Sequence, residues 1–195
     1  MNNHKKLLSN SRCEDKNTMR GPHCKNIGFS EPTSTVTLRD LNGNPIVPGR
    51  RYLIESLAFP GQVISSETWH NGWYPELWAI LKFESGEPIR FEQSGDHVLL
   101  LTDYTEVTIP EFDIEEPKYL SEDPTNPGVD FALRGSRSQW LVTEPTDPDL
   151  VAGNYYAFKN YYSGKFMSAR DSLGWLYVER SSMESRTMWR FRPMG

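Results

Sequence analysis

A unit that opens on a short strand and closes on a tryptophan occurs three times along this chain of 195 residues. The opening runs follow Gly49, Gly95 and Gly153. Because one such unit cannot bury its own apolar face, three of them must close together. The repeat predicts an all-β fold, the β-trefoil, with three pseudo-repeats of four strands each. The closing tryptophans lie 62 and 49 residues apart in short apolar runs, at Trp78, Trp140 and Trp189.

The residue composition favours strands from about Val36 onward. Short runs rich in Val, Ile, Tyr, Phe, Trp and Thr alternate with turn pairs such as Asn42-Gly43. This density of Gly and Pro leaves no convincing helical stripe. A β-sandwich whose tryptophans simply fill the core is the alternative fold. We predict a trefoil domain over residues 35–195 after a disordered polar tail, residues 1–34, whose removal should not lower stability.

Charge, apolar runs and cysteines exclude several classes of protein. The formal net charge of −5 argues against nucleic acid as a partner, because phosphate binding needs a basic face. No apolar run approaches the roughly 18 residues of a membrane span, and no signal-peptide core is found. Cys13 and Cys24 both lie in the tail, so the domain can form no internal disulfide. We therefore expect a cytoplasmic monomer that binds neither membrane nor nucleic acid, with non-classical secretion as the alternative.

No metal, cofactor or catalytic site is predicted. The potential metal ligands of the tail, which include Cys13 and Cys24, match no zinc spacing. The domain lacks a nucleophile elbow and a phosphate loop, and His70 and His97 are isolated in sequence. We expect a protein that is not an enzyme, because trefoils present loops for binding more often than for chemistry.

The start of the domain resembles a known family. The segment Leu38–Ile46 is followed, after five residues, by the segment Tyr52–Ile54. In the first segment, an aliphatic residue stands two positions before an aspartate. A polar-Gly-polar turn, an aliphatic residue and a Tyr-x-aliphatic strand follow. This pattern resembles the N-terminal signature of the Kunitz soybean-type (STI-like) inhibitors, which are β-trefoils. We expect Asp40 to bond to the backbone of the turn, Gly43 to be left-handed, and Ile46 and Tyr52 to face inward. Weaker resemblance covers Glu87–Phe91, Leu101–Asp103 and Ser138–Val142.

Two departures from that family bear on function. The usual two disulfides of the family are absent. In its trypsin-inhibiting members, the loop between strands four and five carries the reactive bond, with Arg or Lys as the primary residue. Here Glu84–Glu87 forms a short acidic turn at that place. Inhibition of trypsin through this turn is therefore not expected, and any peptidase would have to be met by other surface loops.

Two loops of the first unit are the candidate partner-binding site. Trp69, His70, Trp73 and Tyr74 cluster in a loop between two predicted strands. Such aromatic side chains can stack on a sugar ring or enter a pocket of a partner protein, whereas a lid over the barrel is the structural alternative. A second projecting loop of the same unit is expected to share this surface, and it contains Phe59, Pro60 and Gly61.

Two further segments are candidate binding surfaces. Arg134 and Arg137 lie at a basic loop tip that resembles a trypsin bait, although a plain hairpin turn explains it equally well. The stretch from Pro110 to Gly128 contains four prolines and reads as a long loop. Its acidic character suggests either a basic partner surface or simple solvation.

The sequence therefore predicts a non-enzymatic binding module without cofactor or metal. Its partner is expected to be a protein, namely a peptidase that the module inhibits through surface loops, or a glycan. The carbohydrate-binding, lectin-like trefoil is the alternative to the Kunitz-like inhibitor. A ricin-type lectin is not favoured, because no Gln-x-Trp motif is present.

Overall fold

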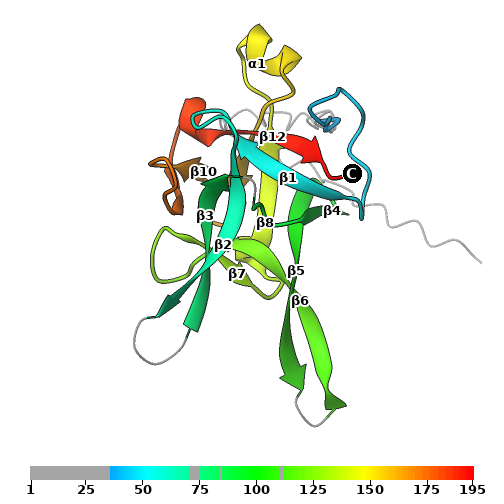
Figure 1. Cartoon of the computed structure of the whole chain (residues 1–195), viewed down its shortest axis with the longest axis vertical. Coiled ribbons are helices and arrows are strands. Elements are labelled where there is room, and N and C mark those ends of the chain that lie inside the picture. Colours follow the sequence, from blue (N-terminus) through cyan, green and yellow to red (C-terminus); the bar gives the residue numbers. More distant parts are fainter. Residues whose placement is uncertain (1–35, 71–74, 84, 110–111) are drawn as a thin grey trace, which may run out of the picture. The chain divides into compact units, whose positions relative to one another are not determined.

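The computed structural model describes residues 36–70, 75–83, 85–109 and 112–195, without the side chains of His70 and Pro75. Six strands in this part of the chain pair antiparallel in a closed ring (Figure 1). They are β1 (Arg51–Ser56), β4 (Ile89–Ser94), β5 (His97–Ile109), β8 (Gln139–Thr143), β9 (Tyr156–Asn160) and β12 (Met188–Pro193). The pairs run β1–β4, β4–β5, β5–β8, β8–β9, β9–β12 and β12–β1. A closed ring buries one face of every strand and leaves no open sheet edge.

The remaining strands form three hairpins that cap one end of this barrel. They are β2 (Gln62–His70) with β3 (Pro75–Phe83), β6 (Ile114–Glu122) with β7 (Val129–Ala132), and β10 (Phe166–Ala169) with β11 (Leu176–Arg180). The last strands of the three hairpins meet one another. Trp78 of β3 pairs with Asp130 of β7, and isolated bridges join Ile80 to Trp175 and Gly128 to Tyr177. A six-stranded barrel with three such hairpins is a β-trefoil, so the predicted fold class is confirmed.

The barrel register identifies the equivalent core positions of the three pseudo-repeats. Tyr52 pairs with Ile89 in the first unit, whereas Val98 pairs with Trp140 in the second. In the third unit, Tyr156 pairs with Trp189. Both tryptophans are fully buried, and their indole N–H groups donate to main-chain carbonyls. In the first unit, Ile89 therefore occupies the core position that a tryptophan occupies in the second and third units.

This register corrects the position predicted for Trp78. Trp78 lies in β3, one strand before the barrel strand that contains Ile89, and its side chain is only partly buried. The error arose because both strands are short apolar runs, and sequence spacing does not show which of them enters the barrel. Trp78 therefore belongs to the cap and not to the core.

The turn that carries the family resemblance forms as predicted. Asp40 is buried, and its Oδ1 accepts from the N–H groups of Asn42 and Asn44 at 2.9 and 3.0 Å. Gly43 has a φ of +78°, which is the left-handed conformation that glycine adopts without strain. Tyr52 is fully buried and Ile46 packs against the core. The turn therefore anchors the start of the domain to the barrel.

The stretch between Pro110 and Gly128 is not the long loop that we predicted. Most of it is β6, which pairs with β5 in a long hairpin that extends away from the barrel (Figure 1). The prolines were misleading because Pro117 lies in the extended part of the hairpin, where a strand edge tolerates a missing N–H. One short helix, α1 (Pro148–Ala152), also forms between β8 and β9. No helix in the described part of the chain is long and apolar enough to span a membrane.

The prediction that residues 1–34 form a disordered tail lies outside the described residues, and so does the side-chain chemistry of Cys13 and Cys24.

Candidate functional site

A groove of about 370 Å³ opens where the three capping hairpins meet. This volume lies within the range of about 300–1,000 Å³ that is typical of small-molecule sites. β3, the turn between β6 and β7, and the start of β11 provide most of its walls. Four of its lining residues are aromatic: Trp69, Trp78, Trp175 and Tyr177.

Two of the aromatic rings that line the groove are nearly perpendicular to each other. The rings of Trp69 and Trp175 meet edge to face, with centroids 6.0 Å apart and an interplanar angle of 86°. Trp69 keeps 52% of its surface exposed, so part of its ring is open to a ligand. Tyr177 also lines the groove, and the Arg170 guanidinium lies 3.8 Å from the centroid of its ring. Together these rings offer flat apolar faces to a ligand.

A glycine makes the floor of the groove possible. A Cβ added to Gly128 would lie 2.1 Å from Cζ3 of Trp78, which is far inside contact distance. The main chain of the β6–β7 turn therefore approaches the indole as closely as only glycine allows. Leu176 is fully buried beside it and closes the apolar floor.

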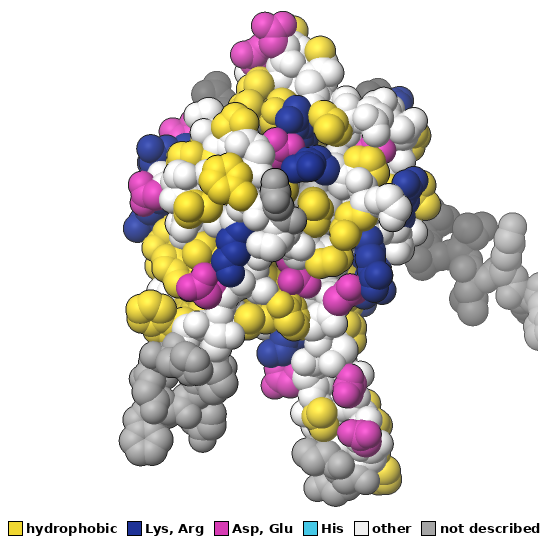
Figure 2. Space-filling model, viewed as in Figure 1, with side chains coloured by type: hydrophobic (Ala, Val, Ile, Leu, Met, Phe, Trp, Pro, Cys, Tyr) yellow, Lys and Arg dark blue, Asp and Glu magenta, His cyan; other side chains and the backbone are white. Residues whose placement is uncertain are grey.

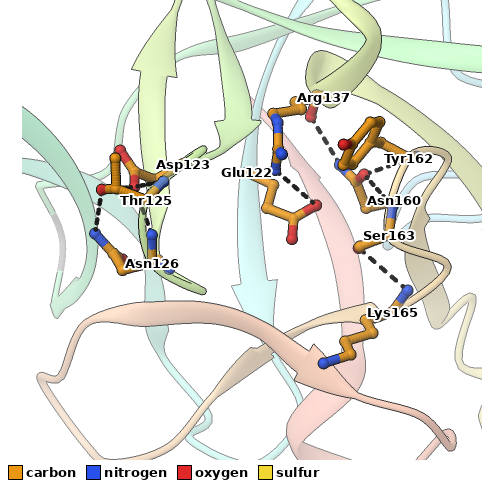
Figure 3. Close-up of polar contacts among 10 residues, drawn as sticks. Glu122, Asp123, Thr125, Asn126, Arg137, Asn160, Tyr162, Ser163 and Lys165 are labelled. Atoms are coloured by element: carbon orange, nitrogen blue, oxygen red, sulfur yellow. Dashed lines mark hydrogen bonds and ion pairs between the residues drawn. The ribbon is translucent and has the colours of Figure 1, made fainter.

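Hydrogen bonds within the β6–β7 turn fix the polar rim of the groove (Figure 3). Asp123 Oδ1 accepts from the Thr125 N–H and hydroxyl at 2.7 and 2.6 Å, and from the Asn126 N–H at 2.9 Å. Asn126 Oδ1 in turn accepts from the Gly128 N–H at 2.7 Å. Thr125 and Asn126 both line the groove, so a hydroxyl and an amide are held at its edge before any ligand arrives.

One carboxyl group lines the groove and another lies close to it. Glu76 lines the groove, and its Oε2 accepts from the Trp78 indole at 3.2 Å. Asp130 lies beside Trp78 on the neighbouring strand. Burial, together with the negative charges of Asp123 and Glu76, raises the pKa of Asp130 to about 7, against the opposing effects of a backbone hydrogen bond and Lys118. Among the described residues no group donates to the buried Asp130 Oδ1. Within the described lining of the groove, no side chain is basic.

The structure separates the two loops that were predicted to share a surface. Trp69 lies on the groove, whereas the side chain of His70 and all of Trp73 and Tyr74 lie outside the described residues. The turn at Phe59–Gly61 comes directly before the start of β2, whereas Trp69 lies near the end of that strand. At about 3.3 Å per residue, the start of β2 and Trp69 are roughly 23 Å apart.

The Phe59–Gly61 turn is also held against the body of the domain. Phe59 packs against the core, Pro60 is exposed, and the Gly61 N–H donates to Glu55 at 2.8 Å. This end of the hairpin therefore forms no common surface with the groove. A role of the turn in binding stays a prediction.

The basic tip formed by Arg134 and Arg137 is tied to its neighbours. Arg134 donates to Glu92 at 3.2 Å. The Arg137 guanidinium lies 4.0 Å from the ring centroid of Tyr162 and 3.9 Å from Glu122, a contact that Figure 3 also shows. Neither arginine is presented on an extended loop as a substrate-like residue would be.

Sequence reasoning missed most of the groove. Trp78 was assigned to the core, and Trp175 and Tyr177 were not singled out. One local signal was available, because side chains two residues apart share one face of a strand. Glu76 with Trp78, and Trp175 with Tyr177, each place two such side chains on one face. That the two pairs converge could not be deduced without the fold.

No family model matches this chain, and no curated protein matches its sequence. Solved structures do resemble it. The water-soluble chlorophyll protein from Brassica oleracea var. Botrytis with chlorophyll b gives a TM-score of 0.59 at 14% identity, over 82% of this chain and 99% of that protein. ThreeFoil, a designed threefold-symmetric protein, gives 0.52 at 15% identity, over 74% and 99%. The Polyporus squamosus lectin gives 0.52 at 12% identity, over 76% of this chain and half of the lectin.

At such low identity these likenesses establish the fold only. They agree with the β-trefoil seen in the strand pairing. Membership of the Kunitz soybean-type family stays a prediction.

Proposed function

We propose that this protein is a non-enzymatic binding module that holds a carbohydrate in the groove between its capping hairpins. The observation that carries the proposal is the convergence of Trp69, Trp78 and Trp175 on one cavity. Indole faces provide large rigid contact areas at little entropic cost, and the C–H face of a sugar ring is the apolar surface that stacks on them.

The polar rim complements the other surface of a sugar. A pyranose carries hydroxyl groups around its edge, and each buried hydroxyl must find a hydrogen-bond partner. Thr125 and Asn126 are held at the edge of the groove by Asp123, so their side chains meet a ligand without first being ordered. Aromatic walls with a few fixed polar groups are the usual composition of a small-molecule site.

One structural neighbour supports this proposal by analogy. The Polyporus squamosus lectin was solved bound to the human-type influenza-binding epitope Neu5Acα2-6Galβ1-4GlcNAc. That lectin therefore binds a glycan, and 76% of the present chain is superposed on half of the lectin.

Peptidase inhibition has less support in the geometry. The described part of the Glu84–Glu87 turn lies against β2, because the Glu87 N–H donates to the Ile64 carbonyl at 2.8 Å. A Cβ at Gly86 would lie 2.6 Å from Val63, so the turn has no room to extend as a bait. An inhibitory contact through this turn is therefore not part of the proposal.

Exposed hydrophobic side chains on the β5–β6 hairpin favour a protein as the second candidate partner. The end of this hairpin exposes Val107, Ile109, Ile114 and Phe112, of which Phe112 is 75% exposed. Figure 2 shows acidic and hydrophobic side chains next to one another along this hairpin. If a peptidase or another protein binds here, Phe112→Ser should weaken that binding, which a panel of serine and cysteine peptidases would measure.

A glycan array tests the main proposal. We expect the protein to bind a defined set of glycans and Trp69→Ala to abolish the signal. Phe112→Ala is the matched control, because it also removes an exposed aromatic ring but lies on the β5–β6 hairpin. Binding that survives Trp69→Ala, or the absence of any bound glycan, would contradict the proposal.

A further inference from the structure

The Thr125 side chain at the rim of the groove has a fixed hydrogen-bond polarity. A carboxylate only accepts hydrogen bonds, and the Thr125 hydroxyl donates its one proton to Asp123 Oδ1 at 2.6 Å. The N–H groups of Thr125 and Asn126 donate to the same oxygen, so the carboxylate is held in place by the turn. The hydroxyl oxygen of Thr125 can therefore only accept a hydrogen bond from a ligand.

The Asn126 side chain has the opposite polarity. Its Oδ1 accepts from the Gly128 N–H at 2.7 Å, so turning the amide over would place two donors against each other. Asn126 Nδ2 lies 3.4 Å from Thr125 Oγ1, which is longer than the usual hydrogen bond of about 2.7–3.2 Å (Figure 3). This contact uses at most one of the two Nδ2 protons. Since no other group in the described part of the chain bonds to Nδ2, the rim offers a donor and an acceptor side by side.

Two neighbouring hydroxyl groups of a sugar match this pair. A hydroxyl can donate or accept, so one can donate to Thr125 while the next accepts from Asn126. Hydroxyl oxygens on adjacent ring carbons lie close together, as the two rim atoms do, unless both are axial and trans. A trans amide directs its N–H and C=O to opposite sides, so an acetamido group cannot meet both rim atoms. An ammonium group offers only donors and a carboxylate only acceptors.

The apolar floor of the groove lies directly beside this pair. A Cβ added to Gly128 would lie 2.1 Å from Trp78 Cζ3 and 2.7 Å from Asn126 Oδ1, so the indole and the amide flank the same glycine. Both side chains also line the groove. A sugar ring whose hydroxyls reach the rim can therefore rest its C–H surface against the indole of Trp78.

We propose that Thr125 and Asn126 make the groove specific for sugars with a free vicinal diol, which is a pair of unsubstituted hydroxyl groups on neighbouring ring carbons. This inference rests on the proposed function, because it names the feature of the glycan that the same groove recognises. Thr125 accepts from one hydroxyl, and Asn126 donates to its neighbour. A sugar in which either hydroxyl is missing or linked to another residue leaves one rim group unpaired.

The experiment removes the hydroxyl groups of a bound glycan one at a time. The probes are the glycan that binds most tightly on the array and its monodeoxy derivatives, each titrated by calorimetry. We expect two derivatives, altered at neighbouring carbons of one ring, to bind about tenfold more weakly, which corresponds to about 1.4 kcal/mol each. The other derivatives should bind almost as tightly as the parent glycan.

Fluorinated derivatives test the polarity of the two contacts. Fluorine in place of a hydroxyl can accept a hydrogen bond weakly but cannot donate one. At the position that faces Asn126, the fluorinated glycan should therefore bind more tightly than the deoxy glycan. At the position that faces Thr125, fluorine should be no better than hydrogen.

Thr125→Val assigns one of the two hydroxyls to its partner. The variant should bind the parent glycan about tenfold more weakly and should no longer distinguish it from the derivative that lacks the hydroxyl facing Thr125, since the same contact cannot be lost twice. Thr125→Ser keeps the hydroxyl and should restore the distinction. Thr105→Val is the matched control, because the Thr105 hydroxyl also donates to a carboxylate, Glu115 at 2.7 Å, but lies on the β5–β6 hairpin.

The outcomes separate this inference from the proposed function. If the sensitive positions are not neighbours, or if fewer than two positions are sensitive, the diol assignment is overturned while the carbohydrate site stands. A folded Thr125→Val variant that still distinguishes every derivative would overturn it as well. If this variant fails to fold, the deoxy and fluorinated series with the parent protein decides alone. If no glycan of the array binds, the proposed function fails and this inference fails with it.

Discussion

The Trp69 and Trp175 rings meet edge to face at a centroid distance of 6.0 Å, although one belongs to the first pseudo-repeat and the other to the third. The contact forms only when the capping hairpins of the trefoil close around their common axis. The isolated bridge between Ile80 and Trp175 places the two walls beside each other. The groove is therefore a product of barrel closure, and no single unit contains it.

The first prediction concerns the glycine in the floor of the groove. Gly128→Ala brings a methyl group into the space of the Trp78 ring, so we expect a loss of about 1–3 kcal/mol of stability together with a displaced indole. Gly135→Ala is the control, because the nearest atom to its added Cβ lies 4.0 Å away. Urea denaturation measures the stability difference. Equal stability of the two variants would show that the close approach is not a constraint.

The second prediction separates core tryptophans from the groove tryptophan. Trp140→Ala and Trp189→Ala should each cost about 3–5 kcal/mol, because both side chains are fully buried. Ile89→Ala should cost about 2–5 kcal/mol, since this residue occupies the equivalent position in the first unit. Trp78→Ala should cost clearly less than either barrel tryptophan. A Trp78 variant as unstable as the Trp140 variant would refute the register that relates the three units.

The third prediction is a pH dependence of stability that originates at Asp130. Burial raises the pKa of its carboxyl group to about 7, while the unfolded chain releases the same proton near its ordinary value of 3.8. Between these two values the folded state binds more protons than the unfolded state, so stability falls as pH rises from about 4 to 7. The contribution of the neutral carboxyl group is therefore complete in acid and lost above pH 7.

Asp130→Asn tests this dependence. The amide cannot ionise, so the variant should have a higher Tm than the parent protein at pH 8 and a similar Tm at pH 4. Glu116→Gln changes an exposed carboxylate and should alter neither value appreciably. A Tm difference of the Asn variant that does not change with pH would assign the effect to packing and not to ionisation.

The sequence predicted the fold better than the site. The glycine-strand-tryptophan unit identified the trefoil because the second and third units place tryptophan in equivalent barrel strands, at Trp140 and Trp189. The first unit has Ile89 there, and its tryptophan, Trp78, lies one strand earlier in β3. Hydrophobicity indicates a buried strand but does not determine which neighbour that strand pairs with.

The site depended on contacts that no local pattern contains. Trp69 was identified because exposed aromatic residues in a predicted loop often bind ligands. Trp175 lies in another pseudo-repeat, and its proximity to Trp69 follows only from the pairing of the capping strands. The predicted neighbour of Trp69, the Phe59–Gly61 turn, lies at the other end of an extended hairpin. A strand of nine residues separates its two ends too far for one binding surface.

The indole N–H resonances of the protein provide the most direct test of a ligand in the groove. Titration of ¹⁵N-labelled protein with a glycan that binds on the array should shift the indole signals of Trp69, Trp78 and Trp175. The signals of Trp140 and Trp189 should stay in place, because these side chains are buried and hydrogen-bonded to main-chain carbonyls. Assignment by single Trp→Phe variants makes the comparison unambiguous. Shifts confined to residues outside the groove, or no shift at all with any glycan of the array, would contradict the account.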